Sequence, residues 1–210
     1  MATDQRGFTL VEIAIVLVII GMILGGILSG QNLIRSTQAK DAIAIAGDLQ
    51  TATTYFKQRY NYLPGDLPNP AADITVVPAL VAGTGGTIGN GLIEGAIAAG
   101  TGFATLGSEV AVAPLQLYSA GFLGKVDIGN PQHIVNTSFG PVHLATPAAS
   151  GVAGYAAANP AVRNVIVFVN LTCDVAREMD IKIDDGNLTT GKAIGTACVG
   201  DIVTRYAVAL

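Results

Sequence analysis

The sequence predicts an α+β fold in which one long N-terminal helix packs on a small antiparallel β-sheet head. Three observations predict it: an apolar N-terminal run, a one-sided apolar pattern that directly follows this run, and short β-branched segments near the C-terminus. A helix with one apolar side needs a surface that covers this side, and a small sheet provides one. We therefore expect a long helix and one globular head.

The N-terminal run extends from Ile13 to Leu28 without a charged residue. An α-helix needs about 20 residues to cross a hydrocarbon core, so we expect a membrane span at about residues 10–30. Glu12 lies near the start of this span, where an unpaired carboxylate costs on the order of 3 kcal/mol or more. Its position predicts that a counter-charge pairs with it.

The segment Gly7-Phe8-Thr9-Leu10-Val11-Glu12, followed by an apolar helix, resembles the N-terminus of type IV prepilins and type II secretion pseudopilins. The resemblance implies cleavage between Gly7 and Phe8 by a prepilin peptidase, followed by N-methylation of Phe8. It also implies that Glu12 pairs with the Phe8 amine of a neighbouring subunit. The resemblance is close over about the first 60 residues and loose over the remainder.

The resemblance divides the chain into a leader (residues 1–7), an N-terminal helix (residues 8–60) and a pilin-like globular head (residues 61–210). It places the N-terminus in the cytoplasm and the head outside, so the precursor is a single-pass protein of the inner membrane. A plain signal anchor or a secretory signal peptide is the alternative, but neither explains the acid four residues after Phe8.

Beyond the span, apolar residues recur at spacings of three and four, which predicts an amphipathic helix that ends before Pro64. The apolar stripe consists of Ala42, Ile45, Leu49, Ala52, Phe56 and Tyr60. Within the span, two G-x-x-x-G pairs suit close helix packing, although glycine is also common in membrane helices generally. These pairs are Gly21 with Gly25 and Gly26 with Gly30.

In the head, the glycine-rich stretch 83–102 predicts loops with little regular structure. A helix is expected from Ser108 to Ala120, with Ser108 as its cap and an inner face that consists of Val112, Leu115 and Tyr118. Strands are expected at 164–169 and 202–208, because both segments are rich in β-branched residues. A further helix is expected at 172–183.

The two cysteines, Cys173 and Cys198, lie in the last quarter of the chain. In an exported head they can form one disulfide, which stabilises by roughly 3 to 4 kcal/mol, whereas two free thiols are the alternative. Pilins often carry a disulfide near the C-terminus, so the resemblance favours the bonded pair.

Composition and motifs favour neither nucleic-acid binding nor catalysis. The net charge is −4 and the 11 Lys and Arg form no cluster, so we expect no nucleic-acid partner. No nucleophile with a base and no metal-ligand motif is present, so we expect no enzyme activity, no cofactor and no metal. Asp180, Asp184 and Asp185 surround a glycine turn; a solvated turn explains them, and a calcium site is the alternative.

We therefore expect a structural subunit of a type IV pilus-like filament. The resemblance implies as partners other copies of this chain, other pilins or pseudopilins, the prepilin peptidase, an inner-membrane assembly platform, and membrane lipid before assembly. The alternatives are a periplasmic pseudopilin of type II secretion and a membrane-anchored binding protein that does not polymerise. What the head binds stays open.

Overall fold

The computed structural model of the chain describes residues 9–76, 78–135 and 137–210. The chain divides into two compact units, Met1–Thr37 and Gln38–Leu210, and helix α1 (Leu10–Tyr60) contributes residues to both. We call the second unit the head. Its other elements are α2 (Pro70–Asp73), α3 (Glu109–Ser119), β1 (Val142–Ala145), α4 (Tyr155–Ala158), β2 (Val165–Thr172), α5 (Cys173–Ile183), β3 (Ile194–Gly195) and β4 (Ile202–Ala209).

In the first unit, α1 is long and apolar enough to cross a membrane. Its segment Leu10–Ile27 has a mean hydropathy of 2.8, and none of it is buried by the rest of the protein. The large side chains along it are exposed, from 90% for Leu10 to 46% for Ile20. This segment agrees with the expected span and needs lipid or other helices around it.

The head contains a four-stranded antiparallel sheet in the order β1-β2-β4-β3. Val165 to Val169 of β2 are buried in succession, so both faces of the sheet are covered. The expected strands at 164–169 and 202–208 correspond to β2 and β4. The strands β1 and β3 were not predicted from the sequence.

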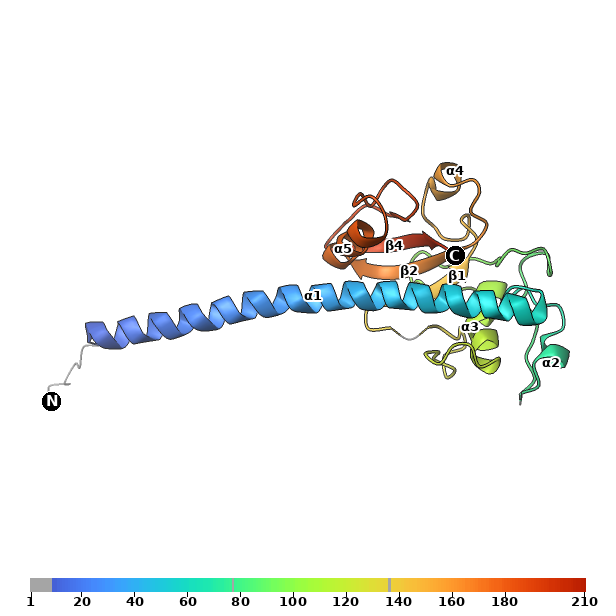
Figure 1. The fold of residues 1–210 in the computed structure, drawn as a ribbon, viewed down its shortest axis with the longest axis horizontal. Helices are drawn as coiled ribbons and strands as arrows, with labels where there is room; N and C mark the ends of the chain where they lie inside the picture. The colour runs from blue at the N-terminus through green and yellow to red at the C-terminus, as the bar shows by residue number, and fades with distance from the viewer. Residues whose placement is uncertain (1–8, 77, 136) are drawn as a thin grey trace. The chain divides into compact units, whose positions relative to one another are not determined.

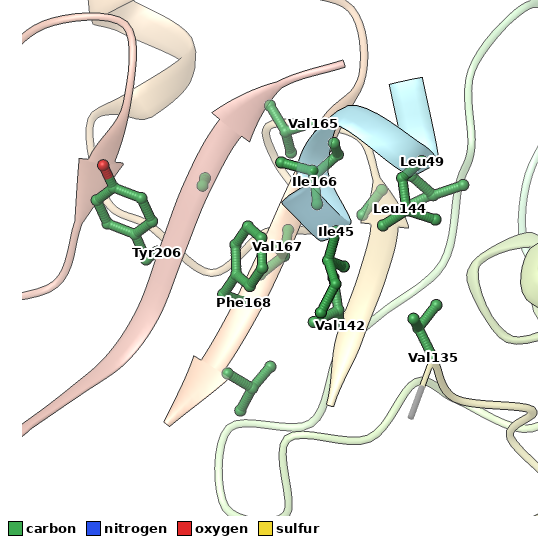
Figure 2. Packing of buried hydrophobic residues seen from close by; sticks show 14 of the residues in the cluster. Ile45, Leu49, Val135, Val142, Leu144, Val165, Ile166, Val167, Phe168 and Tyr206 are labelled. Atoms are coloured by element: carbon green, nitrogen blue, oxygen red, sulfur yellow. The ribbon is translucent and has the colours of Figure 1, made fainter. Parts of the chain in front are cut away.

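One face of the sheet packs on the head segment of α1, which runs along the strands in Figure 1. Val142 and Leu144 lie opposite Phe168 and Ile166, so these four side chains share a face. Figure 2 shows Ile45 and Leu49 of α1 with residues of this face in one buried cluster. The predicted stripe is confirmed, because five of its six members are buried and Tyr60 is half-buried.

The other face of the sheet is covered by the glycine-rich segment 83–102. Two polar side chains on this face, His143 of β1 and Arg205 of β4, bond to backbone carbonyls of that segment. The Nε2 atom of His143 lies 2.9 Å from the carbonyl of Gly102. A Cβ at Gly102 would lie 2.5 Å from Val169, and the φ of Gly102 is +74°, so glycine permits this close approach.

Helix α3 begins as the sequence predicts but buries more of its surface than the predicted face. The Ser108 hydroxyl accepts a hydrogen bond from the Ala111 N–H, which caps the helix. Val112 is buried and the half-buried Leu115 packs against the core, as expected, whereas Tyr118 is 40% exposed, so the predicted inner face is wrong at Tyr118. Loops cover additional sides of α3, and its buried residues therefore exceed a single stripe. They are Glu109, Val110, Ala111, Val112, Ala113, Pro114, Gln116 and Leu117.

Two buried carboxylates fix the loops that lead into α3. Asp66 accepts hydrogen bonds from the backbone N–H groups of Gly89, Asn90 and Gly91. Glu109 accepts one from the N–H of Glu94 at 2.7 Å, while its second oxygen is buried without a partner among the described residues. Burial is the main cause that raises the pKa of Glu109 to about 7.

The guanidinium of Arg205 links β4 to the glycine-rich segment. Its Nη2 donates to the carbonyls of Ile97 and Ala98 at 3.2 Å and 2.6 Å, and the residue is 5% exposed. We expect Arg205→Ala to lower the free energy of unfolding by about 3 kcal/mol, because it leaves a cavity and removes the donor from a buried carbonyl. Urea unfolding of the full chain in detergent, followed by circular dichroism, measures this loss.

Exposed Arg177→Ala is the matched control for the arginine prediction and should change the free energy of unfolding by less than about 0.5 kcal/mol. An Arg205→Ala protein as stable as this control would contradict the proposed contribution of the guanidinium. Limited proteolysis gives a second readout. We expect protease to cleave within residues 95–105 faster in the Arg205→Ala protein than in the Arg177→Ala protein.

Glu109 and His143 should give opposing pH dependences of stability. Burial raises the folded-state pKa of Glu109 from 4.5 to about 7, so its contribution to stability is lost as the pH rises through that range. Burial lowers the folded-state pKa of His143 from 6.5 to about 4, so its contribution is lost as the pH falls from 6.5 to 4. The two slopes partly cancel, and each is at most about 1.4 kcal/mol per pH unit.

Single variants separate the two slopes. Relative to the wild type, stability should rise more steeply with pH in Glu109→Gln and fall more steeply with pH in His143→Gln. Urea unfolding at pH 4.5, 5.5, 6.5 and 7.5 measures both differences, and the comparison with the wild type subtracts the other titrating groups. Parallel curves for all three proteins would contradict the assignment.

Candidate functional site

The candidate assembly site lies at the start of α1, where Thr9 and Glu12 cap the helix. The Glu12 Oε2 atom accepts hydrogen bonds from the Thr9 N–H at 2.8 Å and from the Thr9 Oγ1 at 2.7 Å. The Glu12 N–H in turn donates to Thr9 Oγ1 at 3.3 Å. This reciprocal pair is a capping box, which satisfies backbone N–H groups that the first turn of a helix leaves without partners.

The capping box was not predicted, although the sequence contains its signal. Thr9-Leu10-Val11-Glu12 has the S/T-x-x-E spacing that precedes many helices. The apolar sequence around Glu12 predicts only that this acid needs a counter-charge. In the structure this acid also has a local role within its own chain.

The capping box leaves Glu12 able to accept a further hydrogen bond. Both contacts with Thr9 use Oε2, and the described residues form no hydrogen bond with Oε1. The side chain is exposed on an apolar helix, where a second charge can approach. Gly7 and Phe8, the predicted cleavage and methylation positions, lie outside the described residues, so the pairing of Glu12 with a Phe8 amine stays a prediction.

The glycine pairs of the span face open space within this chain. No atom outside the local helix backbone lies within 4 Å of a Cβ built at Gly21, Gly25, Gly26 or Gly30. A second helix can therefore approach the α1 backbone at these positions. The role of the four glycines in helix packing stays a prediction, since it concerns contacts with another molecule.

The two cysteines of the head form a disulfide. Cys173 and Cys198 are bonded, with a Cα–Cα distance of 5.8 Å. The bond ties the first residue of α5 to the segment before β4. The sequence-based expectation of a bonded pair is thus confirmed.

In the acidic turn after α5, the carboxylates accept hydrogen bonds from backbone N–H groups of the same segment. The Asp184 Oδ2 atom accepts from the N–H groups of Lys192 and Ala193 at 2.5 Å and 2.8 Å. Asp185 accepts from the Asn187 N–H and the Thr190 hydroxyl.

Asp180 is buried, and it accepts a hydrogen bond from the Tyr206 hydroxyl at 2.7 Å. Its burial raises the pKa of the carboxyl. Among the residues that the structure describes, no group of three acidic, histidine or cysteine side chains is arranged to hold a metal ion. The hydrogen bonds of the three aspartates support the turn and β4.

Comparisons with known proteins bear on the N-terminal segment. Residues 3–28 match a family model described as the prokaryotic N-terminal methylation motif. This motif is the signature of type IV prepilins and pseudopilins. No curated protein and no solved structure matches the chain.

Proposed function

From this prepilin signature, we infer that the chain is the precursor of a structural subunit that assembles into a type IV pilus-like filament. One observation carries the inference: a methylation motif leads into the apolar segment Leu10–Ile27, whose only acid, Glu12, lies near its start. The signature implies processing by a prepilin peptidase and assembly with other pilin subunits in general. The precursor resides in the inner membrane by its single span, and the assembled form is a surface fibre.

The exposed side chains of α1 support polymerisation. Residues such as Leu10, Leu17 and Met22 are 90%, 63% and 75% exposed, and lipid covers them before assembly. Extraction from the membrane would place them in water at a cost of about 25 cal/mol per Å² of apolar surface. Packing against the same helix of other subunits avoids this cost, and the open glycine positions permit close contact.

The proposed role is structural rather than catalytic. Three buried polar side chains of the head, Glu109, His143 and Arg205, form hydrogen bonds with backbone groups. Groups committed in this way support loops and are not positioned as nucleophile and base. We therefore assign no reaction to the chain.

The experiment that tests the function is N-terminal mass spectrometry of the protein from its native host. We expect a mature chain that begins at methylated Phe8, and an uncleaved chain when the prepilin peptidase is deleted. A mature protein that retains Met1 in the presence of the peptidase would overturn the proposal and indicate a static membrane anchor.

Electron microscopy of sheared surface fibres then separates the two types of filament. A surface pilus predicts fibres that contain this chain in sheared material. Fibres confined to the periplasm would identify a pseudopilin of type II secretion instead. The proposed surface pilus would be wrong in that case, while processing at Phe8 would stand.

A further inference from the structure

An asparagine is followed directly by a glycine at Asn90–Gly91, and this pair occurs nowhere else in the sequence. An asparagine loses its side-chain amide when the next main-chain nitrogen attacks its Cγ atom. A glycine at the second position favours this attack, because it has no Cβ to obstruct the approach and allows many backbone conformations. Asn90 is therefore the position at which deamidation of the chain is chemically most favoured.

The contacts of the folded head oppose this attack. The Gly91 N–H, which must lose its proton, donates to the Oδ2 atom of the buried Asp66 at 2.7 Å. The Asn90 Oδ1 accepts from the Leu92 N–H at 2.7 Å, and the Asn90 Nδ2 donates to the Glu94 Oε2 at 2.7 Å. The attacking nitrogen and both ends of the side-chain amide are thus bound.

The backbone of Asn90 is fixed as well. Its N–H donates to the Asp66 Oδ1 at 3.2 Å, and its carbonyl accepts from the Arg163 Nη2 at 3.3 Å. Hydrogen bonds to a carboxylate are stronger than those between neutral groups, so the loop 86–92 is held firmly at Asn90. Ring closure between the Gly91 nitrogen and the Asn90 Cγ therefore requires a local opening of this loop first.

The products of deamidation do not fit the loop. An aspartate at position 90 would place an oxygen where the Asn90 Nδ2 donates to Glu94, so two carboxylates would repel each other at hydrogen-bond distance. An isoaspartate would add one methylene to the main chain, so the N–H groups of residues 89–91 would no longer all reach Asp66. Either product therefore prevents the loop from closing again.

We propose that Asn90 is a deamidation site, that Asp66 and Glu94 protect it in the folded head, and that its conversion irreversibly loosens the loop 86–92. The Gly91 nitrogen forms a bond to the Asn90 Cγ, the Cγ–Nδ2 bond breaks, and ammonia leaves with the proton of the Gly91 N–H. Water then opens the cyclic imide at the side-chain carbonyl to give aspartate, or at the main-chain carbonyl to give isoaspartate. This chemistry needs only the head and water, and it does not depend on polymerisation.

Mass spectrometry of the full chain, incubated in detergent micelles and then digested, measures the reaction in the peptide that contains residue 90. The exchange of NH2 for OH changes the mass, and chromatography separates aspartate from isoaspartate. We expect conversion to be at least about tenfold faster in urea than in the native protein, because unfolding removes the protecting contacts. Asn187, which is exposed and followed by a leucine, is the internal control and should convert much more slowly in both states.

Variants of the two acids test the protection. Asp66→Asn and Glu94→Ala should each speed native-state conversion by about tenfold, because each removes a charge-assisted hydrogen bond. The matched control is Asp73→Ala, since Asp73 is exposed and does not contact the loop, and it should convert at the wild-type rate. Circular dichroism confirms that each variant is folded, and the half-buried Glu94 decides the comparison should Asp66→Asn fail to fold.

Two results would overturn the protection. Equal rates in the native and the unfolded wild type would show that the contacts of Asn90 do not matter. Slower conversion in Asp66→Asn would show that this carboxylate acts as a base on the Gly91 N–H and promotes the reaction.

The loosening of the loop has its own test, because Asn90→Asp installs one product directly. We expect protease to cleave within residues 86–92 about tenfold faster in this variant than in the wild type, since like charges then face each other in the loop. Asn187→Asp makes the same chemical change in an exposed turn and should leave this cleavage unchanged. Cleavage of the Asn90→Asp protein at the wild-type rate would overturn the proposed loosening.

Discussion

Replacing Glu12 by alanine is expected to abolish fibre assembly while the precursor remains in the membrane. The substitution removes the only acid of the apolar segment Leu10–Ile27, so a neighbouring Phe8 amine would enter the fibre core without a counter-charge. Insertion itself should improve, since an unpaired carboxylate in a span costs on the order of 3 kcal/mol. Electron microscopy and the amount of this chain in sheared fibres, compared with the membrane fraction, measure the effect.

The capping box requires a control that separates the two roles of Glu12. Thr9→Ala removes the hydroxyl that bonds Glu12 but retains the carboxylate. Loss of a cap costs about 1 kcal/mol, so we expect this variant to assemble with reduced yield. If Thr9→Ala abolished fibres as completely as Glu12→Ala, capping would suffice to explain the phenotype and the intermolecular charge pair would be unnecessary.

Removing the disulfide is expected to destabilise the head by about 3.5 kcal/mol, the value for a closed loop of about 25 residues. The Cys173→Ser and Cys198→Ser double variant frees the start of α5 from the segment before β4. Urea unfolding of the full chain in detergent, with and without reductant, measures the difference.

The variant serves as its own control for the disulfide prediction, because reductant should lower the stability of the wild type and leave the variant unchanged. If reductant left the free energy of unfolding of the wild type unchanged while the double variant was less stable, the loss would come from the serine side chains and not from the missing bond. Cys173 is 2% exposed, so a serine there buries a hydroxyl, which by itself lowers the free energy of unfolding.

The elements that the sequence predicts are those with strong local patterns. The stripe from Ala42 to Phe56 repeats at helical spacing over four turns, and Val165 to Val169 is an unbroken β-branched and aromatic run. These patterns result from burial against large surfaces. In a long regular element, successive turns or residues face the same surroundings. The same types of residue therefore recur, and the pattern can be recognised in the sequence.

The missed elements depend on contacts between distant segments. β1 is short and contains His143, whose burial is understood only with the Gly102 carbonyl 41 residues away in the chain. The stretch 83–102 reads as loops, and its role as a cover for the sheet depends on Arg205 and Glu109. Small residues and glycines carry no periodic signal, so side-chain patterns fail to predict this layer.

The candidate site was predicted in part. The residues around Gly7 and Glu12 predict a prepilin-type N-terminus from the sequence alone, and the family model that matches residues 3–28 agrees. An acid in an apolar span is costly, so its presence there is a strong signal. The hydrogen bonds between Thr9 and Glu12 were found only in the structure.

The cover over the sheet is held through main-chain carbonyls, at Ile97, Ala98 and Gly102. Main-chain atoms are common to nearly all amino acids, so this attachment places little demand on the identity of the outward-facing side chains. Substitutions of the outward-facing side chains of the cover should therefore leave this attachment intact, whereas substitutions of His143 or Arg205 beneath it should not.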